Sequence, residues 1–156
     1  MALPVHLKDV VDEMDMIGDE TVAYIHRRTG ELIGLTSEAM ALAEDDGEDI
    51  SPSHDWLEEM VNQARQIISD RDYVELPDKF EINEYGIMER YCDTVEDERA
   101  RRALLKAING KGAFRRFKDE ISEQELQKDW YKFRDNAFRQ IAADFLARED
   151  IAFVDD

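Results

Sequence analysis

The apolar pattern of the first half of the chain predicts one short helix and a small sheet. Apolar positions recur every three or four residues from Leu7 to Met16, as in an amphipathic helix. Thr21–Ile25 and Glu31–Thr36 read as strands, and Gly30 between them supplies the turn of a hairpin. Tyr73–Leu76 is a third short strand, which a small sheet needs to be stable.

The rest of the pattern is helical. We expect a short helix from Ser37 to Ala43 and a longer one, capped by Ser53, that runs to Ile68. Glycine tolerates the left-handed backbone that ends many helices, so we expect Gly110 to end the helix Asp97–Asn109. In order, the helices after Ser37–Ala43 are Ser53–Ile68, Glu81–Val95, Asp97–Asn109, Ala113–Ile121 and Leu126–Phe145.

A capping box and the apolar spacing lead to specific predictions for the last two helices. Ser122 and Glu125 have the spacing of a capping box, in which each side chain satisfies a backbone donor near the other residue. The apolar spacing predicts which side chains point inward from the two helices: Phe114, Phe117 and Ile121, followed by Leu126, Trp130, Phe133, Ala137, Ile141 and Phe145.

Together these elements predict an α+β fold. A small antiparallel sheet, made by the hairpin and a third short strand, precedes a predominantly helical C-terminal half. The chain has 156 residues, and no linker rich in glycine or serine interrupts it. We therefore expect a single domain spanning residues 1–156.

Charge is distributed very unevenly along this acidic chain, whose formal net charge is −18. Residues 99–118 contain eight basic side chains and no acidic one, whereas residues 44–59 contain eight acidic side chains and no lysine or arginine. Clustered charge attracts partners of the opposite sign, so each segment is a candidate binding surface. An equally simple interpretation is that the two segments neutralise one another inside the protein.

The composition also limits the classes of protein to consider. No apolar run approaches the roughly 20 residues that span a bilayer, and no leader peptide is expected at the start. We therefore expect a cytoplasmic protein without a membrane partner. Cys92 is the sole cysteine, which excludes an internal disulfide, and its place on an apolar stripe with Met88 predicts a buried thiol.

Several stretches of the sequence resemble a known family. They are LPDKFEINEY at 76–85, GKGAFRRFKD at 110–119, WYKFR at 130–134 and the Thr29-Gly30-Glu31 turn. The chain is similar over roughly residues 22–151 to a bacterial family of small acidic proteins catalogued as an uncharacterised protein family (UPF). The resemblance implies a bacterial cytoplasmic protein. It implies no activity, cofactor or catalytic residue.

The best candidate site is the basic segment around two glycines. Gly110 and Gly112 allow a close backbone approach, and cations at the start of a helix favour an anion. This is not a phosphate-binding P-loop, because no hydroxyl residue follows Lys111 and a helix precedes it. The proposed anion-binding residues are Arg102, Lys106, Lys111, Arg115, Arg116 and Lys118. A solvated helix face with ordinary caps is the alternative interpretation of the same residues.

No catalytic or metal-binding motif stands out. The acidic segment fails the EF-hand pattern, because Asp49 stands where glycine is required and Asp55 where glutamate is required. We therefore expect no metal and no cofactor. The favoured function is a non-enzymatic binding or regulatory module for RNA or another phosphate-bearing ligand. A protein-interaction adaptor using the acidic surface is the alternative, and an enzyme with a site assembled across helices is a third reading. The sequence does not indicate an oligomeric state.

Overall fold

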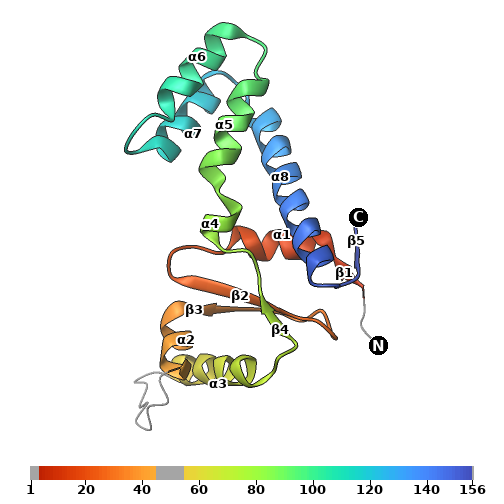
Figure 1. Ribbon diagram of the computed structural model, residues 1–156. Helices are drawn as coiled ribbons and strands as arrows, with labels where there is room; N and C mark the ends of the chain where they lie inside the picture. The colour runs from red at the N-terminus through yellow and green to blue at the C-terminus, as the bar shows by residue number, and fades with distance from the viewer. Residues whose placement is uncertain (1–3, 45–54, 156) are drawn as a thin grey trace. The chain divides into compact units, whose positions relative to one another are not determined.

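The computed structural model describes residues 4–44 and 55–155, and its chain divides into two compact units (Figure 1). The sheet unit comprises Met1–Glu81 and Ile141–Asp156, and the helical unit comprises Ile82–Gln140. Both chain ends therefore belong to the sheet unit. The α+β fold predicted from the sequence is confirmed, whereas the expectation of a single domain stays a prediction.

The sheet unit contains the predicted antiparallel sheet. Strand β2 (Thr21–His26) lies between β3 (Leu32–Thr36) and β4 (Tyr73–Glu75), so β3 and β4 are the outer strands. The hairpin register pairs Val22 with Leu35 and Tyr24 with Ile33. Because successive side chains of a strand alternate between faces, these four apolar residues share one face of the sheet.

Three helices lie wholly within the same unit. Helix α1 (Leu7–Asp15) buries its predicted apolar stripe, and α2 (Ser37–Glu44) and α3 (Asp55–Ser69) pack against each other and against the sheet. Their shared core includes the buried side chains of Leu35 and Ala64. The predicted cap Ser53 and the acidic stretch at 45–54 lie outside the described residues.

A second, very short sheet joins the two ends of the chain. Strand β1 (Val5–His6) pairs in parallel with β5 (Phe153–Val154), and Val5 lies opposite Phe153. No sequence pattern predicted these strands. Two residues are too few to establish an alternation of apolar and polar positions.

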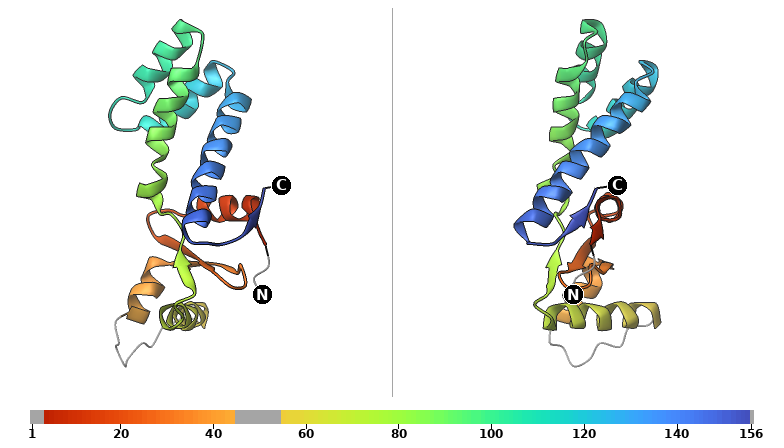
Figure 2. Two further views of the ribbon diagram at one scale, coloured as in Figure 1. Left: turned by 45° about the vertical axis from the view of Figure 1, so that its right-hand side comes forward. Right: turned by 90° about the vertical axis from the view of Figure 1, so that its right-hand side faces the viewer.

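The helical unit contains three whole helices: α5 (Glu84–Thr94), α6 (Glu98–Ala107) and α7 (Ala113–Glu123). It also contains the last residue of α4 (Lys79–Ile82) and the first part of α8 (Gln127–Arg148). Helices α6 and α7 form a helical hairpin and lie side by side in both views of Figure 2. The core contains an aromatic cluster in which the Trp130 ring lies 4.8 Å from Phe117 and 5.3 Å from Tyr91, centroid to centroid.

Two details of the predicted helices are wrong. The expected helix Glu81–Val95 is broken at Asn83, which takes a left-handed backbone with φ of 51° and caps α5 through a hydrogen bond from the Gly86 N–H. The expected capping box at Ser122 does not form, because Ser122 is still inside α7. Helix α7 ends instead in a Schellman motif. Glu125 has φ of 57°, and the Leu126 N–H donates to the Ile121 carbonyl.

Helix α8 is the longest helix, as predicted, but its buried face is rotated from the predicted one. Trp130 and Phe145 are buried as expected. Ala137 and Ile141 are only half-buried, and Phe138 and Ala142 take their places in the core. The helix holds apolar side chains on several faces, so spacing alone does not single out the buried one.

Candidate functional site

The predicted anion-binding residues lie on α6, on α7 and in the loop between these helices. Arg102 and Lys106 are one turn apart on α6, and both are exposed. Lys111 lies in the loop, and Arg115 and Lys118 are exposed on α7. The helical hairpin therefore brings the two halves of the basic segment onto neighbouring helices.

Arg116 differs from the other five because its guanidinium group is used inside the protein. Its Nε donates to the Ala107 carbonyl at 2.9 Å, its Nη2 donates to the Asn109 carbonyl at 2.7 Å, and its Nη1 donates to the Lys111 carbonyl. Two of these acceptors belong to the loop, and Ala107 ends α6. Arg116 thus supplies donors to carbonyls that have no partner within the helix.

The two glycines of the loop suit the hydrogen bonds that Arg116 makes there. Gly110 and Gly112 have φ of 90° and 76°, a backbone conformation that disfavours side chains. A Cβ atom at Gly112 would lie 3.1 Å from Nη1 of Arg116, so the absence of a side chain also makes room for the guanidinium. These glycines therefore have a structural reason for their positions, independent of any ligand.

The remaining five cations differ in how they are paired. Arg102 forms an ion pair of 2.7 Å with Glu98, one turn away, and both side chains are well exposed. Exposed pairs of this kind contribute little to stability and are readily exchanged for another partner. Lys106, Lys111, Arg115 and Lys118 form no ion pair within residues 4–44 and 55–155.

The expectation that Phe114 points inward is wrong, because 46% of its surface is exposed. The inward stripe of α7 is instead formed by Ala113, Phe117 and Ile121. Phe114 lies at the edge of this stripe, since it is one residue beyond Ala113 and therefore about 100° further round the helix. The change places an exposed aromatic ring next to Arg115 and one turn from Lys118.

A shallow hollow of about 370 Å³ lies on the α6–α7 hairpin. Its charged lining residues are of both signs: Lys106 and Arg116 stand beside Asp119 and Glu120. The two carboxylates oppose an anion at this place. Lys111, Arg115 and Lys118 lie outside this hollow and, unlike Arg102, form no ion pair in the described part of the chain, so they are the better candidates for contact with a negatively charged ligand.

Cys92 is confirmed as a buried residue, with none of its surface exposed. Burial, assisted by the Asp93 carboxylate, raises the pKa of the thiol to about 11. Since the thiolate is the reactive form, this cysteine is an inert core residue at neutral pH.

One cluster of potential metal ligands occurs in the described part of the chain: His26, Asp70 and Asp72, whose ligand atoms lie within 4.8 Å of one another. Both ring nitrogens of His26 already form hydrogen bonds. Its Nδ1 accepts from the N–H groups of Arg28 and Thr29, so Nε2 carries the proton and donates to Asp70 at 3.1 Å. A neutral imidazole in this state has no lone pair left for a metal, and the residues therefore do not fit a metal site.

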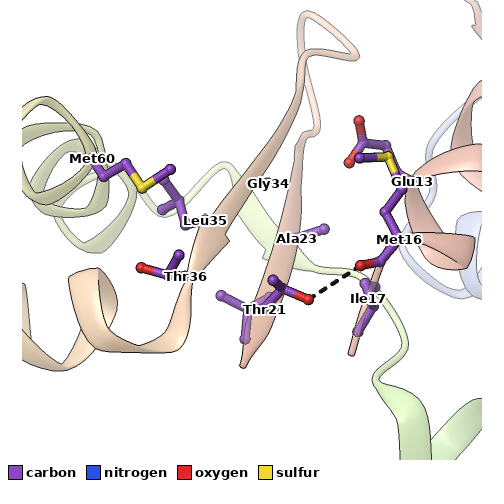
Figure 3. Close-up of a pocket in the computed structure, with 10 residues that line it drawn as sticks. Glu13, Met16, Ile17, Thr21, Ala23, Gly34, Leu35, Thr36 and Met60 are labelled. Carbon is purple, nitrogen blue, oxygen red and sulfur yellow. Dashed lines mark hydrogen bonds between the residues drawn. The ribbon is translucent and has the colours of Figure 1, made fainter. Parts of the chain in front are cut away.

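A second hollow, of about 180 Å³, lies in the sheet unit and is lined by both strands of the hairpin, β2 and the outer strand β3. Figure 3 shows Met60 and Leu35 on one side of the strands and Glu13, Met16 and Ile17 on the other. Its lining contains one carboxylate, from Glu13, and no basic residue. No local sequence pattern signals this hollow, because its lining comes from α1, the hairpin and α3.

The position of Gly34 explains part of this hollow. Gly34 is an exposed residue in the middle of β3, and a Cβ atom there would approach the Glu13 Oε2 to 3.4 Å. The rest of the wall is mainly apolar. Below Met16, the Thr21 hydroxyl donates to the Met16 carbonyl at 3.2 Å and so ties the end of α1 to the start of β2 (Figure 3).

Comparison with known proteins identifies the family. The model of the uncharacterised protein family UPF0158 matches residues 2–156. The chain belongs to the UPF0158 family. This membership confirms the resemblance inferred from the sequence motifs.

One bacterial relative illustrates how far the similarity to curated UPF0158 proteins extends. UPF0158 protein PA5073 of Pseudomonas aeruginosa is 33% identical over 67 residues, which are 42% of this chain and 44% of the relative. The aligned region thus spans less than half of either protein. No solved structure matches the chain. Among the described residues, no helix is long and apolar enough to cross a membrane.

Proposed function

We propose that this UPF0158 protein is a non-enzymatic binding module of the bacterial cytoplasm that holds a phosphate-bearing ligand, foremost single-stranded RNA, on the α6–α7 hairpin. The observation that carries the proposal is the group of exposed cations on α7 and in the loop before it that have no ion-pair partner in the described part of the chain: Lys111, Arg115 and Lys118.

The charge of the helical unit weakens an objection to this function. A chain of net charge −18 should repel nucleic acid. Residues 82–140, however, contain 13 basic and 12 acidic side chains, so the formal charge of this unit is +1. An anion approaching the α6–α7 hairpin meets a nearly neutral unit with a local excess of cations on its surface.

The exposed ring of Phe114 favours RNA over a simple phosphate. Proteins that bind single strands combine cations, which contact the backbone, with aromatic rings, on which bases stack. Phe114 is 46% exposed and is followed directly by Arg115. Stacking on such a ring contributes about 1–3 kcal/mol per base.

The test is a titration of a labelled 12-nucleotide single-stranded RNA at several salt concentrations, with tripolyphosphate as a competitor. Binding should weaken as salt rises, because bound cations are released from the phosphates. The triple variant Lys111→Gln, Arg115→Gln, Lys118→Gln should weaken binding at least tenfold. Its salt dependence, the slope of log K against log salt, should fall by about 2, since each lost contact to a single strand removes roughly 0.7.

Two controls separate the site from overall charge. The triple variant Lys8→Gln, Arg65→Gln, Arg71→Gln makes the same charge change on exposed residues of the sheet unit and should bind RNA like the wild type. Phe114→Leu should weaken RNA binding and leave tripolyphosphate binding unchanged. Absence of RNA binding at low salt, or an equal loss in both triple variants, would reject the proposal.

A specific observation favours the adaptor function as a second candidate. The sheet unit contains 7 basic and 26 acidic residues, a formal charge of −19, and is therefore suited to a basic protein partner. The enzyme reading has less support. Cys92 is buried with a raised pKa, and both nitrogens of the His26 ring are engaged.

A further inference from the structure

We infer that the outer strand β3 of the sheet unit is a docking edge for an extended basic segment of a partner protein, which adds to the sheet as a further strand. This site is separate from the α6–α7 hairpin and does not depend on the RNA function proposed above.

The first argument is the open edge of the sheet. In the order β3-β2-β4, strand β3 pairs with β2 alone among the described strands, so its other side offers unpaired backbone N–H and C=O groups. Proteins commonly blunt such edges with proline, with an inward-pointing charge or with a covering element. The sequence of β3, Leu-Ile-Gly-Leu-Thr, contains neither proline nor charge.

The second argument is the hollow that β3 lines together with β2. Its lining includes residues from both faces of the hairpin: Ala23 and Gly34 are paired and share one face, whereas Val22 and Leu35 share the other. An added strand directs alternate side chains to the two faces of a sheet. On the face of Val22 and Leu35, the hollow of about 180 Å³ offers space for an apolar side chain of the added strand. On the other face, Gly34 has no side chain of its own and leaves room for a basic side chain of the strand to reach Glu13.

The third argument is charge, and it decides which partner fits. Glu13 is the charged residue of the hollow, and Glu31 and Glu38 stand exposed just before and just after β3. The nearby arginines of the hairpin turn are already neutralised, since Arg27 pairs with Glu149 and Arg28 pairs with Asp72. A partner strand should therefore alternate lysine or arginine with apolar residues.

The recognition mode predicts how binding responds to changes in the partner. In strand addition, main-chain hydrogen bonds provide the affinity and side-chain pockets provide the specificity. We would measure binding by fluorescence anisotropy with a labelled nine-residue peptide that alternates lysine with valine and leucine. The same peptide N-methylated at alternate backbone nitrogens keeps its charge and side chains but loses the donors toward β3. We expect at least tenfold weaker binding of the methylated peptide.

Matched variants test the hollow and the charge. Gly34→Val fills the space beside Gly34 without changing charge and should weaken binding about tenfold, with circular dichroism to establish that the fold is kept. Glu13→Gln should weaken binding severalfold and reduce its salt dependence. Glu59→Gln, an exposed carboxylate on α3, is the control and should leave binding unchanged.

Three results would overturn the inference. Equal binding of the methylated and parent peptides would exclude strand addition, whether or not the variants fold. Equal binding of a peptide with glutamate in place of lysine would exclude the charge argument. A dimer in sedimentation velocity that Gly34→Val dissociates, and that the peptide does not disrupt, would identify a second copy of the chain as the occupant. None of these measurements involves RNA, so they stand or fall independently of the α6–α7 function.

Discussion

The two units of this protein differ in charge far more than in size. Residues of the sheet unit carry a formal charge of −19, whereas those of the helical unit carry +1, so almost the whole net charge of −18 resides in one unit. The average charge of a chain thus says little about the partners of either part. Each unit presents its own field to its own class of ligand.

The units also differ in what fills their cores. The helical unit gathers large aromatic rings, with Tyr91, Phe117 and Trp130 almost completely buried. The core of the sheet unit, around Leu35 and Ala64, is mainly aliphatic and reaches onto α2 and α3. A change in either core should therefore reveal whether the units unfold together or apart.

The largest effect is expected from Trp130→Ala. Truncation of this side chain, 3% exposed, should cost about 3–5 kcal/mol of the free energy of unfolding, because it leaves a cavity between Tyr91 and Phe117. Chemical denaturation gives the total loss, and amide hydrogen exchange assigns it to a unit. Tyr131→Ala, in which the adjacent ring is 61% exposed, is the control and should cost less than about 1 kcal/mol. Equal losses of protection against exchange in the amides of β2 and of α5 would mean that the two units unfold as one.

Arg116→Gln should have the next largest effect. The change removes donors to three carbonyls around the α6–α7 loop and should cost about 1.5–3 kcal/mol, the range for hydrogen bonds made by a charged group. Arg115→Gln removes the same charge from the neighbouring exposed residue and should change stability by less than about 0.5 kcal/mol. Urea denaturation of both variants provides the comparison. Equal stability of the two would contradict the structural role of Arg116.

Added salt should stabilise the sheet unit and should change the stability of the helical unit less. Self-repulsion in the sheet unit weakens when salt screens its charges, so raising KCl from about 0.01 to 0.5 M should stabilise β2 amides against exchange by roughly 0.5–1 kcal/mol. Amides of α5, in the nearly neutral helical unit, should change less. A larger response in α5 than in β2 would reverse the electrostatic contrast between the units.

The smallest effect concerns Glu75 on β4. Partial desolvation of the Glu75 carboxyl, followed by the charges of Asp78 and Glu81, raises its pKa above the ordinary value of 4.5. The native state therefore favours the protonated form, and this contribution to stability is present at low pH and is lost as pH rises through the raised pKa.

Glu75→Gln should consequently stabilise the protein slightly at pH 7, by less than about 0.5 kcal/mol, and should give no gain at pH 3. Thermal melts at the two pH values measure the difference, with Glu59→Gln as the control. A gain that persists at pH 3 would assign the effect to packing instead of charge.

The parts of the fold that sequence analysis predicted correctly depend on local patterns. The alternation in β2 and β3 and the turn at Gly30 fall within one short stretch, and the same holds for the apolar stripe of α1. The break at Asn83 was missed because the apolar periodicity continues across it. The pairing of β1 with β5 joins opposite ends of the chain and depends on tertiary structure, which periodicity cannot report.

The candidate site has the same limit. The sequence identified the cations of residues 99–118, and the structure separates them by partner: Arg116 bonds to carbonyls, Arg102 pairs with Glu98, and others face solvent. The type of a residue determines which interactions are chemically possible, and the fold determines which of them form. The hollow beside β3 could not be predicted, since its walls come from four separate elements.

The short ladder between β1 and β5 has a consequence for the order of events during synthesis. Because residues 82–140 are enclosed within the chain of the sheet unit, the ribosome completes the helical unit before residues 141–156 emerge. Val5 precedes residues 82–140 and Phe153 follows them, so this ladder can close only after the helical unit has been synthesised. The sheet unit is therefore completed last at this ladder, whereas its three-stranded sheet, formed by β2, β3 and β4, needs no residue beyond the helical unit.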